Sequence, residues 1–519
     1  MKVTIQSKYL VFPVNTKAEM KELVFWSSKQ QVYKLNMQLD HLTPNFNAYI
    51  DVSAYKGEVL DITVSTETEL VFRETDTMDI PGLYAEPERP QIHFSTKNGW
   101  LNDPNGLVWW NGRYHMFYQH NPASNSWENM HWGHAVSTDL IHWEEKDIAL
   151  FPDSRGMMFS GSAIVDHRNL LGKNTEKSQA AVLFYTTTEP FCQNISYSTD
   201  NFETIEHYAG NPIVPHIKGD NRDPKVIFCE EMNCYIMVIF TEGEEYCILR
   251  SDNLTEWSEV QRILLPGDNE CPDIFPLEDE NGNRRWVLMG AGDRYLIGVF
   301  REGKFVPEQS ALSLHYGNTA YAGQTFSNLP DGRRIRVVWE HWPNQEDHFK
   351  CQMGIPVELS LDRFNDRFYV QAKPIQELET IYKDTLRYKK VLLSGENKFS
   401  KGLKDSPYMI KIGGKVPESG KMEVEMFGQK MRIDFEANQI SMNTWQVPFS
   451  ITKKEIDLIV IIDRCGVEVY TDNGKMYMSW HAKETVCDRT QSLFILSASQ
   501  EMYLEKVELY ELDSIWKSK

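Results

Sequence analysis

The chain has 519 residues, a formal net charge of -20 and 41% hydrophobic residues. Its length exceeds what one hydrophobic core usually supports, so we expect two or three domains with well-filled cores and no global disorder. The negative charge repels polyanions, which argues against a nucleic-acid partner or an anionic membrane surface and favours a neutral substrate over a phosphorylated one.

Residues 1–85 are rich in short alternating runs such as "LVFRE" and "VLDITVS". Period-two alternation is typical of strands with one buried face, which predicts a small N-terminal β-sandwich. The first 14 residues alternate as well and lack the uninterrupted apolar run of a signal peptide, and no stretch of the chain approaches the 18 apolar residues of a membrane span. The segment "IPGLYAEPERPQ" at 80–91 has the proline-rich, charged character of a linker.

Residues 86–360 contain short strands broken by Gly, Asn, Asp and Pro, with one recurring phrase. It reads "STDLIHW" from 137, "STDNFET" from 198 and "SDNLTEW" from 251. A Ser-x-Asp or Ser-Asp turn that returns about every 50 to 60 residues is typical of β-propeller blades, which have four strands each.

A second set of landmarks keeps the same period, because five polar residues each open an apolar run. They are Asp103, Ser160, Asp223, Glu270 and Gln324. Five starts predict a five-bladed propeller, and residues at equivalent starts of inner strands converge on one central funnel. Three of the five carry an acid. We also expect the prolines that follow Asp103 and Asp223 to hold both aspartates in extended backbone geometry.

Residues 365–519 change to longer alternating strands. The clearest is "IDLIVIIDRCGVEVYTDNG" at 456–474, whose "DNG" is a hairpin-turn signal. We interpret this tail as a C-terminal β-sandwich. The predicted fold class is therefore all-β: a five-bladed propeller followed by a sandwich, with an extra small N-terminal β-domain.

The eight cysteines are scattered without CxxC pairs. This spacing favours free thiols in a reducing cytoplasm over a disulfide framework or a zinc site, so the sequence predicts a cytoplasmic protein. A chain trimmed of an export signal would look the same.

Three carboxylates in one funnel cannot all ionise freely, because like charges at close range raise at least one pKa. Separating two carboxylates into a proton donor and an ionised partner is the usual device of glycoside hydrolysis. Tryptophans are frequent around Asp103, and aromatic rings suit a sugar. We interpret each as propeller core except Trp127 and Trp339, which we expect at the site.

The "HWGH" stretch invites a metal interpretation through His131 and His134. No partner acids stand at ligand spacing, so buried strand histidines are the expected alternative. We predict no metal and no cofactor.

Six segments together resemble glycoside hydrolase family 32, the β-fructofuranosidases that include invertases, inulinases and levanases. They are "HFSTKNGWLNDPNGL", "FYQHNP", "MHWGHAVSTDLIHW", "FSGSA", "RDPKV" and "ECPDIF". The resemblance covers about 91–342 and the tail around 459–474, and it implies a five-bladed propeller followed by a β-sandwich.

The resemblance also implies roles. Asp103, in the N-D-P-N-G motif, would be the nucleophile that forms a covalent fructosyl-enzyme, and Glu270, in the E-C-P motif, would be the general acid/base. Asp223, in the R-D-P motif, would hold fructose hydroxyls and stabilise the transition state. Further residues match positions that shape the pocket: Asn102, Gln119, Trp127, Phe159, Ser160 and Arg222. Trp339 is expected there on the aromatic argument alone.

The chain departs from the family pattern at five positions. His315, Thr319 and Ala320 replace two acids and a phenylalanine in "HYGNTAYAGQTF", His120 stands where Tyr is common, and Glu128 stands where Gly is usual. We expect these departures to affect the outer subsites. The N-terminal domain is extra, and it could serve in homo-oligomer formation or in packing against the propeller.

The sequence is compatible with three functions, given in decreasing order of preference. The first is an exo-acting β-fructosidase that removes terminal fructose from fructans, fructo-oligosaccharides and sucrose. The second is a sucrose-preferring invertase or a fructosyltransferase on the same machinery, and the third is a fructan-binding propeller without catalysis. The sequence leaves open β-2,1 or β-2,6 preference, endo or exo action, and oligomeric state.

Overall fold

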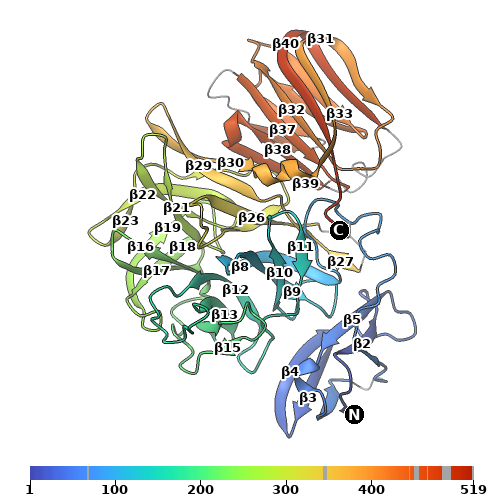
Figure 1. The fold of residues 1–519 in the computed structure, drawn as a ribbon, viewed down its shortest axis with the longest axis vertical. Helices are drawn as coiled ribbons and strands as arrows, with labels where there is room; N and C mark the ends of the chain where they lie inside the picture. Colours follow the sequence, from blue (N-terminus) through green and yellow to red (C-terminus); the bar gives the residue numbers. More distant parts are fainter. Residues whose placement is uncertain are drawn as a thin grey trace.

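The structure, a computed structural model, describes residues 1–66, 69–342, 348–442, 445–448, 455–464, 466–481 and 492–516. In this part of the chain almost all regular structure is β, which confirms the predicted all-β class. The helical segments described are three short 3-10 turns: η1 (Ser53–Tyr55), η2 (Gln376–Ile381) and η3 (Asp472–Gly474). No helix among the described residues combines the length and apolar character needed to cross a bilayer. Figure 1 shows an N-terminal body in blue, a central ring of sheets, and a C-terminal body in orange and red.

The N-terminal domain consists of two antiparallel sheets. The first has the order β1 (Lys2–Thr4), β6 (Val59–Val64), β3 (Lys21–Ser27), β4 (Gln30–Met37); the second has the order β5 (Phe46–Asp51), β2 (Tyr9–Val14), β7 (Arg73–Thr75). Alternate residues of both sheets, such as Leu10, Phe12, Phe25 and Leu35, are buried in one shared hydrophobic cluster. Strand β4 is an edge strand of its sheet.

The central region contains five successive sheets among the described residues. The first sheet has the strand order β11 (Trp143–Glu145), β10 (His131–Ser137), β9 (Arg113–Asn121), β8 (Gly99–Trp110), β27 (Phe349–Lys350), and the second has β12 (Met158–Val165), β13 (Ala181–Thr188), β14 (Phe191–Ser198), β15 (Glu206–His207). The third sheet has β16 (Arg222–Cys229), β17 (Cys234–Glu242), β18 (Glu245–Ser251), β19 (Ser258–Leu264), and the fourth has β20 (Asp273–Glu278), β21 (Arg284–Met289), β22 (Arg294–Arg301), β23 (Lys304–Pro307), with β24 (Leu312–Ser313) also paired to β22. The fifth sheet has β25 (Ala320–Thr325), β26 (Arg334–Glu340), β29 (Val357–Phe364), β30 (Arg367–Pro374), with β28 (Gln352–Met353) also paired to β26.

These five sheets, which we call the ring, close on themselves through their first strands. Strand β8 contacts β12, β12 contacts β16, β16 contacts β20, β20 contacts β25, and β25 contacts β8 again. The recurring phrase found in the sequence marks one turn in the first three sheets, because Ser137, Ser198 and Ser251 each end the third strand. In each case the serine hydroxyl bonds to an Asp or Asn side chain two residues on.

The fifth sheet runs past the boundary expected near residue 360. Strands β29 and β30 form a hairpin, and β29 pairs with β26, so the sheet continues to Pro374. The alternation seen after residue 365 is therefore shared by the last strand of the ring and the strands of the C-terminal region. Alternation reports one buried face and does not say which core covers it.

The C-terminal region forms one extended set of antiparallel strands: β31 (Tyr382–Lys401), β32 (Tyr408–Lys415), β33 (Lys421–Met426), β34 (Gln429–Asp434), β35 (Gln439–Met442), β36 (Trp445–Pro448), β37 (Glu455–Ile462), β38 (Gly466–Thr471), β39 (Met476–His481) and β40 (Leu493–Leu512). The long strand β40 pairs with β33 near its start and with β32 near its end, while β31 follows most of its length. The predicted "DNG" turn joins β38 to β39 as a hairpin.

Six cysteines lie in the described residues, and all six are buried thiols that form no disulfide with one another. Cys465 and Cys487 fall outside the described residues.

Candidate active site

One cavity of about 320 Å³ lies where the first strands of the ring converge. Thirteen residues line it: Asn102, Asp103, Gln119, Trp127, Phe159, Ser160, Asp220, Arg222, Asp223, Glu270, Cys271, Tyr321 and Trp339. All ten residues that the sequence predicted for a site are among them, although they span almost 240 positions of the chain. The remaining three, Asp220, Cys271 and Tyr321, were not predicted.

The first strands are irregular where they reach this cavity. Pairing with the second strand shifts register between Leu101 and Pro104 in β8, Phe159 and Gly161 in β12, Arg222 and Lys225 in β16, and Tyr321 and Gln324 in β25. A bulge leaves a residue outside the ladder and re-aims its side chain. In three of these sheets the residues left outside the ladder include Asp103, Ser160 and Asp223, which face the cavity. In the fourth sheet Tyr321 is the last paired residue before the shift.

The backbone at the acids corrects one prediction. Asp223 has φ of 64°, Glu270 has φ of 55° and Cys271 has φ of 34°, so all three lie in the left-handed region that residues with a Cβ adopt rarely. The proline after Asp223 therefore does not keep that aspartate extended, because the bulge overrides its local preference. Uncommon backbone conformations of this kind cluster at functional sites, where the surrounding structure holds them.

Asp103 is held by a short chain of donors. Ser160 Oγ donates to its Oδ2 at 2.6 Å, and Asn102 Nδ2 donates to its Oδ1 at 3.1 Å. The indole of Trp100 in turn donates to Asn102 Oδ1 at 2.7 Å and fixes the amide orientation. Burial raises the pKa of Asp103 above its ordinary value, while the hydrogen bonds from Ser160 and Asn102 oppose the rise.

Asp223 is the more deeply buried aspartate, with only 3% of its surface exposed. Burial raises its pKa to about 7, against the lowering effect of Arg222, and the nearby Asp103 adds to the rise. Its Oδ2 accepts a hydrogen bond from the Cys271 backbone N–H at 3.0 Å. The Cys271 thiol lies 3.4 Å from Oδ2 of both Asp103 and Asp223, so the two carboxylates flank one sulfur atom.

Glu270 reaches the cavity from the turn before β20. Arg222 Nη2 forms an ion pair with its Oε1 at 2.6 Å, and the Tyr321 hydroxyl donates to its Oε2 at 2.7 Å. Arg222 also lies 3.6 Å from Asp223 Oδ2 through its Nε and 2.5 Å from Asp220 Oδ2 through its Nη1. One arginine therefore links three carboxylates on the same side of the cavity.

Two tryptophans that the sequence singled out stand at the cavity wall. Trp127 is 48% exposed, and its ring is 6.0 Å from that of Phe159. Trp339 is partly buried between Trp100 and Tyr321. Trp100, Trp110, Trp132 and Trp342 are buried, as the core interpretation expected, whereas Trp109 and Trp143 are partly buried against the core.

The departures from the family pattern lie away from the cavity lining. His315 Nε2 bonds to Ser479 Oγ at 2.9 Å, and Thr319 Oγ1 donates to the same oxygen at 2.6 Å. Ala320 is buried at the start of β25, and His120 is buried against the Trp100 carbonyl. His315 and Thr319 therefore dock the segment before β25 onto β39 of the C-terminal region.

His131 and His134 are buried in β10, as the alternative to a metal site predicted. Burial lowers the pKa of His131 to about 3 and that of His134 well below its ordinary value. His131 bonds to Tyr33 of the N-terminal domain, and His134 stacks on Phe117.

A second group of titratable side chains lies between the ring and the C-terminal region. His93, Glu340 and Glu468 are buried with potential ligand atoms within 4.8 Å of one another. The carboxylate oxygens already accept hydrogen bonds: Glu340 from Gln352 and Tyr477, and Glu468 from Tyr470 and the Ile355 N–H. A metal ion would have to displace these donors, and we call this group, His93, Glu340 and Glu468, the sealed ionic cluster.

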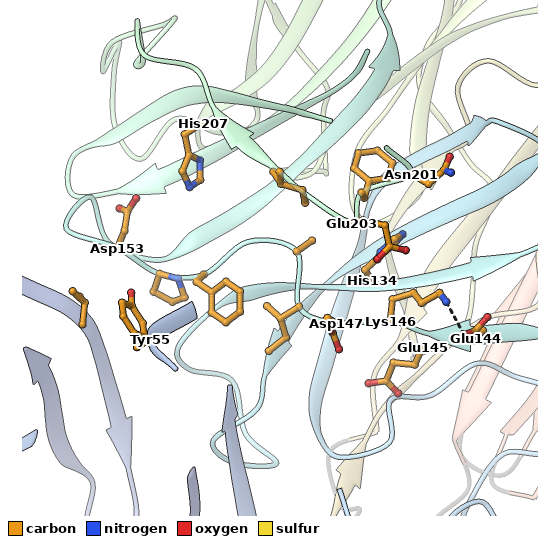
Figure 2. Close-up of a pocket in the computed structure, with 17 residues that line it drawn as sticks. Tyr55, His134, Glu144, Glu145, Lys146, Asp147, Asp153, Asn201, Glu203 and His207 are labelled. Carbon is orange, nitrogen blue, oxygen red and sulfur yellow. Dashed lines mark hydrogen bonds and ion pairs between the residues drawn. The ribbon is translucent and has the colours of Figure 1, made fainter. Parts of the chain in front are cut away.

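A larger cavity of about 670 Å³ lies at the seam between the N-terminal domain and the first two sheets of the ring. Figure 2 shows its wall, where acids such as Glu144, Asp147 and Glu203 stand apart and Lys146 pairs with Glu144. Asp147 and Glu203 are exposed to solvent, so the cavity lacks the buried, linked acids of the smaller one.

A family model, the N-terminal domain of glycosyl hydrolases family 32, matches residues 93–372. The levanase of Bacillus subtilis is 31% identical over 491 residues, which cover 83% of this chain and 72% of that protein. The fructan beta-fructosidase of Streptococcus mutans is 29% identical over 494 residues, and this chain spans only 34% of its length.

Solved structures show the same fold. The exo-inulinase of Aspergillus awamori superposes with a TM-score of 0.73 at 23% identity, over 83% of this chain and 100% of that chain. The beta-fructofuranosidase of Schwanniomyces occidentalis, complexed with fructosyl-erythritol, gives 0.74 at 23% identity, over 84% of this chain and 100% of that chain.

Proposed function

The chain belongs to glycoside hydrolase family 32, and on this premise we propose that it is a retaining β-fructosidase that releases terminal fructose from fructans and fructo-oligosaccharides. The observation that carries the proposal is the meeting of Asp103, Asp223 and Glu270, from three different sheets, around one cavity. The levanase and inulinase names of similar proteins support fructans as the substrate class. Sucrose is a further proposed substrate.

The proposed mechanism follows the retaining scheme. Asp103, oriented by Ser160 and Asn102, attacks the anomeric carbon of the fructosyl unit, while Glu270 protonates the departing glycosidic oxygen. Glu270 then removes a proton from the water that hydrolyses the fructosyl-Asp103 ester. Asp223 and Arg222, which lie 3.6 Å apart, bind hydroxyls of the same ring. The carboxylate of Asp223 stabilises the positive charge that develops on the sugar.

We propose the five sheets as the blades of a propeller and the N-terminal and C-terminal regions as flanking β-sandwiches. The closed ring of contacts between first strands supports the five-blade assignment. The domain boundaries proposed are 1–85, 86–374 and 375–519, since β30 ends at Pro374.

The test is chromatography of the earliest products from inulin, levan, sucrose and short fructo-oligosaccharides. Fructose as the only early product supports the exo-acting hydrolase. Early release of short oligosaccharides would replace it by an endo-acting enzyme, and new longer products at high sucrose would replace it by a fructosyltransferase. Absence of any product would leave a fructan-binding protein without catalysis.

A further inference from the structure

The N-terminal domain contacts a loop of the ring that contributes to the wall of the active-site cavity. This loop, residues 122–130, joins β9 to β10 and carries Trp127 at its exposed tip. Its two ends are buried: Ala123 and Ser124 on one side, Asn129 and Met130 on the other. Ala123, Ser124 and Asn129 contact the N-terminal domain, whereas Met130 packs in the core of the ring.

The first attachment is apolar. Ala123 is fully buried and belongs to the hydrophobic cluster of the N-terminal domain, together with Tyr33, Leu35 and Met37 of strand β4. Phe151, which follows the first sheet of the ring, packs against the same cluster. The loop therefore contributes a side chain to the core of another domain.

The second attachment covers an exposed strand edge. Strand β4 is at the edge of its sheet, and an edge strand leaves backbone N–H and C=O groups unpaired. The side-chain amide of Asn129 pairs with the backbone groups of Asn36 at this edge. Its Oδ1 accepts a hydrogen bond from the Asn36 N–H at 2.8 Å, and its Nδ2 donates one to the Asn36 carbonyl at 2.8 Å. One amide thus replaces a missing strand neighbour.

Side chains of β4 and the residue after it hold the loop on both sides of Trp127. Asn36 Nδ2 donates to Glu128 Oε1 at 3.3 Å, and Ser124 Oγ donates to Gln38 Oε1 at 3.0 Å. Glu128 directly follows Trp127 and stands where the family pattern has Gly. Glu128, which departs from the family pattern, therefore contacts the extra N-terminal domain.

Asn121, the last residue of β9, links the two ends of the loop. Its Oδ1 accepts from the Ala123 N–H at 3.0 Å and from Asn129 Nδ2 at 3.2 Å, and its Nδ2 donates to the Ser126 carbonyl at 2.8 Å. Ser126 is the residue before Trp127. Displacement of Asn129 or Ala123 is thus transmitted to the backbone that carries the indole.

We propose that the N-terminal domain is a positioning element of the substrate-binding site, in which β4 fixes the 122–130 loop so that Trp127 forms the outer wall for the sugar next to the terminal fructosyl unit. The inference rests on the proposed function for the nature of the ligand. An unattached loop of nine residues would have to be ordered when substrate binds, and that entropy cost would weaken binding. Attachment to β4 orders the loop beforehand.

The test compares two variants of the full chain. The double variant Asn36→Ala, Gln38→Ala removes the two side-chain contacts from the N-terminal domain and changes no residue of the cavity. The matched control is Lys8→Ala, which removes another contact between the same domain and the ring, the ion pair of Lys8 with Asp147, away from the loop. The measurements are kcat and KM with a fructo-oligosaccharide, and hydrogen exchange of residues 122–130.

For the double variant we expect KM to rise about fivefold with kcat within about twofold, because weakened binding rather than chemistry is affected. Exchange in 122–130 is expected to accelerate, and Lys8→Ala is expected to resemble the wild type in all three measurements. Unchanged KM and unchanged exchange in the double variant would overturn the proposal, as would the same KM increase in Lys8→Ala.

A second variant tests the same contact from the side of the ring, in case the double variant does not fold. Asn129→Gly removes the amide from the ring side and keeps a residue that tolerates the φ of 51° found at Asn129. It is expected to raise KM and accelerate exchange in the same way, and wild-type behaviour would overturn the proposal. A wild-type chain that releases no fructose from any fructan would contradict the proposed function alone, and the exchange comparison would still decide whether the domain holds the loop.

Discussion

In the described part of the chain, two clusters of buried and half-buried carboxylates differ in their access to a ligand. Asp103, Asp223 and Glu270 face a cavity of about 320 Å³, whereas Glu340 and Glu468 lie sealed between the ring and the C-terminal region. In both clusters burial raises the pKa of an acid: that of Asp223 to about 7 and that of Glu340 to about 8. A raised pKa alone therefore does not distinguish them.

The difference lies in how the oxygens are used. In the sealed cluster tyrosine hydroxyls, an amide and a backbone N–H occupy the carboxylates, and His93 lies between Asp463 at 2.8 Å and Glu468 at 3.6 Å. In the cavity the acids are linked on one side by Arg222, Ser160 and Tyr321 and face open space on the other. Buried acids indicate catalysis or binding where a ligand can reach them. They indicate a structural role where hydrogen-bond donors of the protein surround them.

The largest contrast is expected between Asp103→Asn and Glu468→Gln. Loss of the nucleophile should lower kcat by about 10⁴-fold or more while thermal stability stays close to the wild type. Glu468→Gln leaves the cavity intact, so kcat of the folded fraction should be unchanged. Assays on matched folded concentrations check this pair, and comparable kcat values in the two variants would remove the distinction.

The second contrast concerns Glu270→Gln. Loss of a general acid is expected to lower kcat by about 10² to 10⁴-fold for natural fructosides. The loss in kcat/KM, which reports formation of the intermediate, should be much smaller for an aryl fructoside whose leaving group departs without a proton. Kinetics with both substrates measure this, and an equal loss with both would contradict the acid role of Glu270.

The third prediction addresses the sealed cluster. Breaking a buried ion pair by removing one partner costs about 3 to 5 kcal/mol, because a buried charge is left unpaired. His93→Gln and Glu468→Gln should therefore each lower the free energy of unfolding by about that amount, measured by urea denaturation. Retention of wild-type stability in both would show that the cluster is not a structural lock.

Tyr321→Phe is expected to have a smaller effect within the cavity. It removes one hydrogen bond to Glu270 and keeps the ring, so kcat/KM should fall by about tenfold, the scale of one bond to a charged group. Trp339→Phe, which also changes an aromatic wall residue, provides a control without a bond to an acid. A larger loss in Trp339→Phe would contradict the role given to Tyr321.

The last expected effect is a pH dependence of stability. Burial lowers the pKa of His93, but bonding to Asp463 and Glu468 outweighs it and raises the pKa from 6.5 to about 10. Because the folded state binds the proton more tightly, this stabilisation is complete below pH 6.5 and is lost as pH rises toward 10. Glu340, whose pKa is raised from 4.5 to about 8, acts in the same direction as pH rises through 4.5 to 8.

Melting temperatures measured from pH 6 to pH 10 test this prediction. The wild type should lose stability steadily over that range, and His93→Gln should start lower and follow a flatter curve. A parallel decline in both would assign the pH dependence to other groups.

The sequence predicted the acids of the cavity because each stands near the start of an inner strand, and a regular spacing of strand starts is visible without a structure. It placed Gln324 among those starts, but β25 begins at Ala320 and its cavity residue is Tyr321, three positions earlier. The bulge between Tyr321 and Gln324 explains the shift, since a bulge changes which residue points inward and leaves no clear signal in composition.

Cys271 was missed for a related reason, because it directly follows Glu270 and an extended strand would point the two neighbours to opposite faces. The left-handed backbone at Glu270 and Cys271 brings both side chains to the cavity instead. Asp220 lies in the turn before β16, outside the strand pattern. The sequence did not predict the sealed cluster either, because Glu340 and Glu468 are 128 positions apart and belong to different sheets.

The account depends most directly on Asp103 as the residue that bonds to the sugar. Glu270→Gln, supplied with an aryl fructoside, should accumulate the intermediate, because its formation no longer needs an acid while its hydrolysis still lacks a base. Intact mass after acid quenching should increase by one fructosyl residue, and peptide mapping should place the increase on Asp103. An adduct on Asp223 or another residue, or turnover with no adduct at any time, would contradict the account.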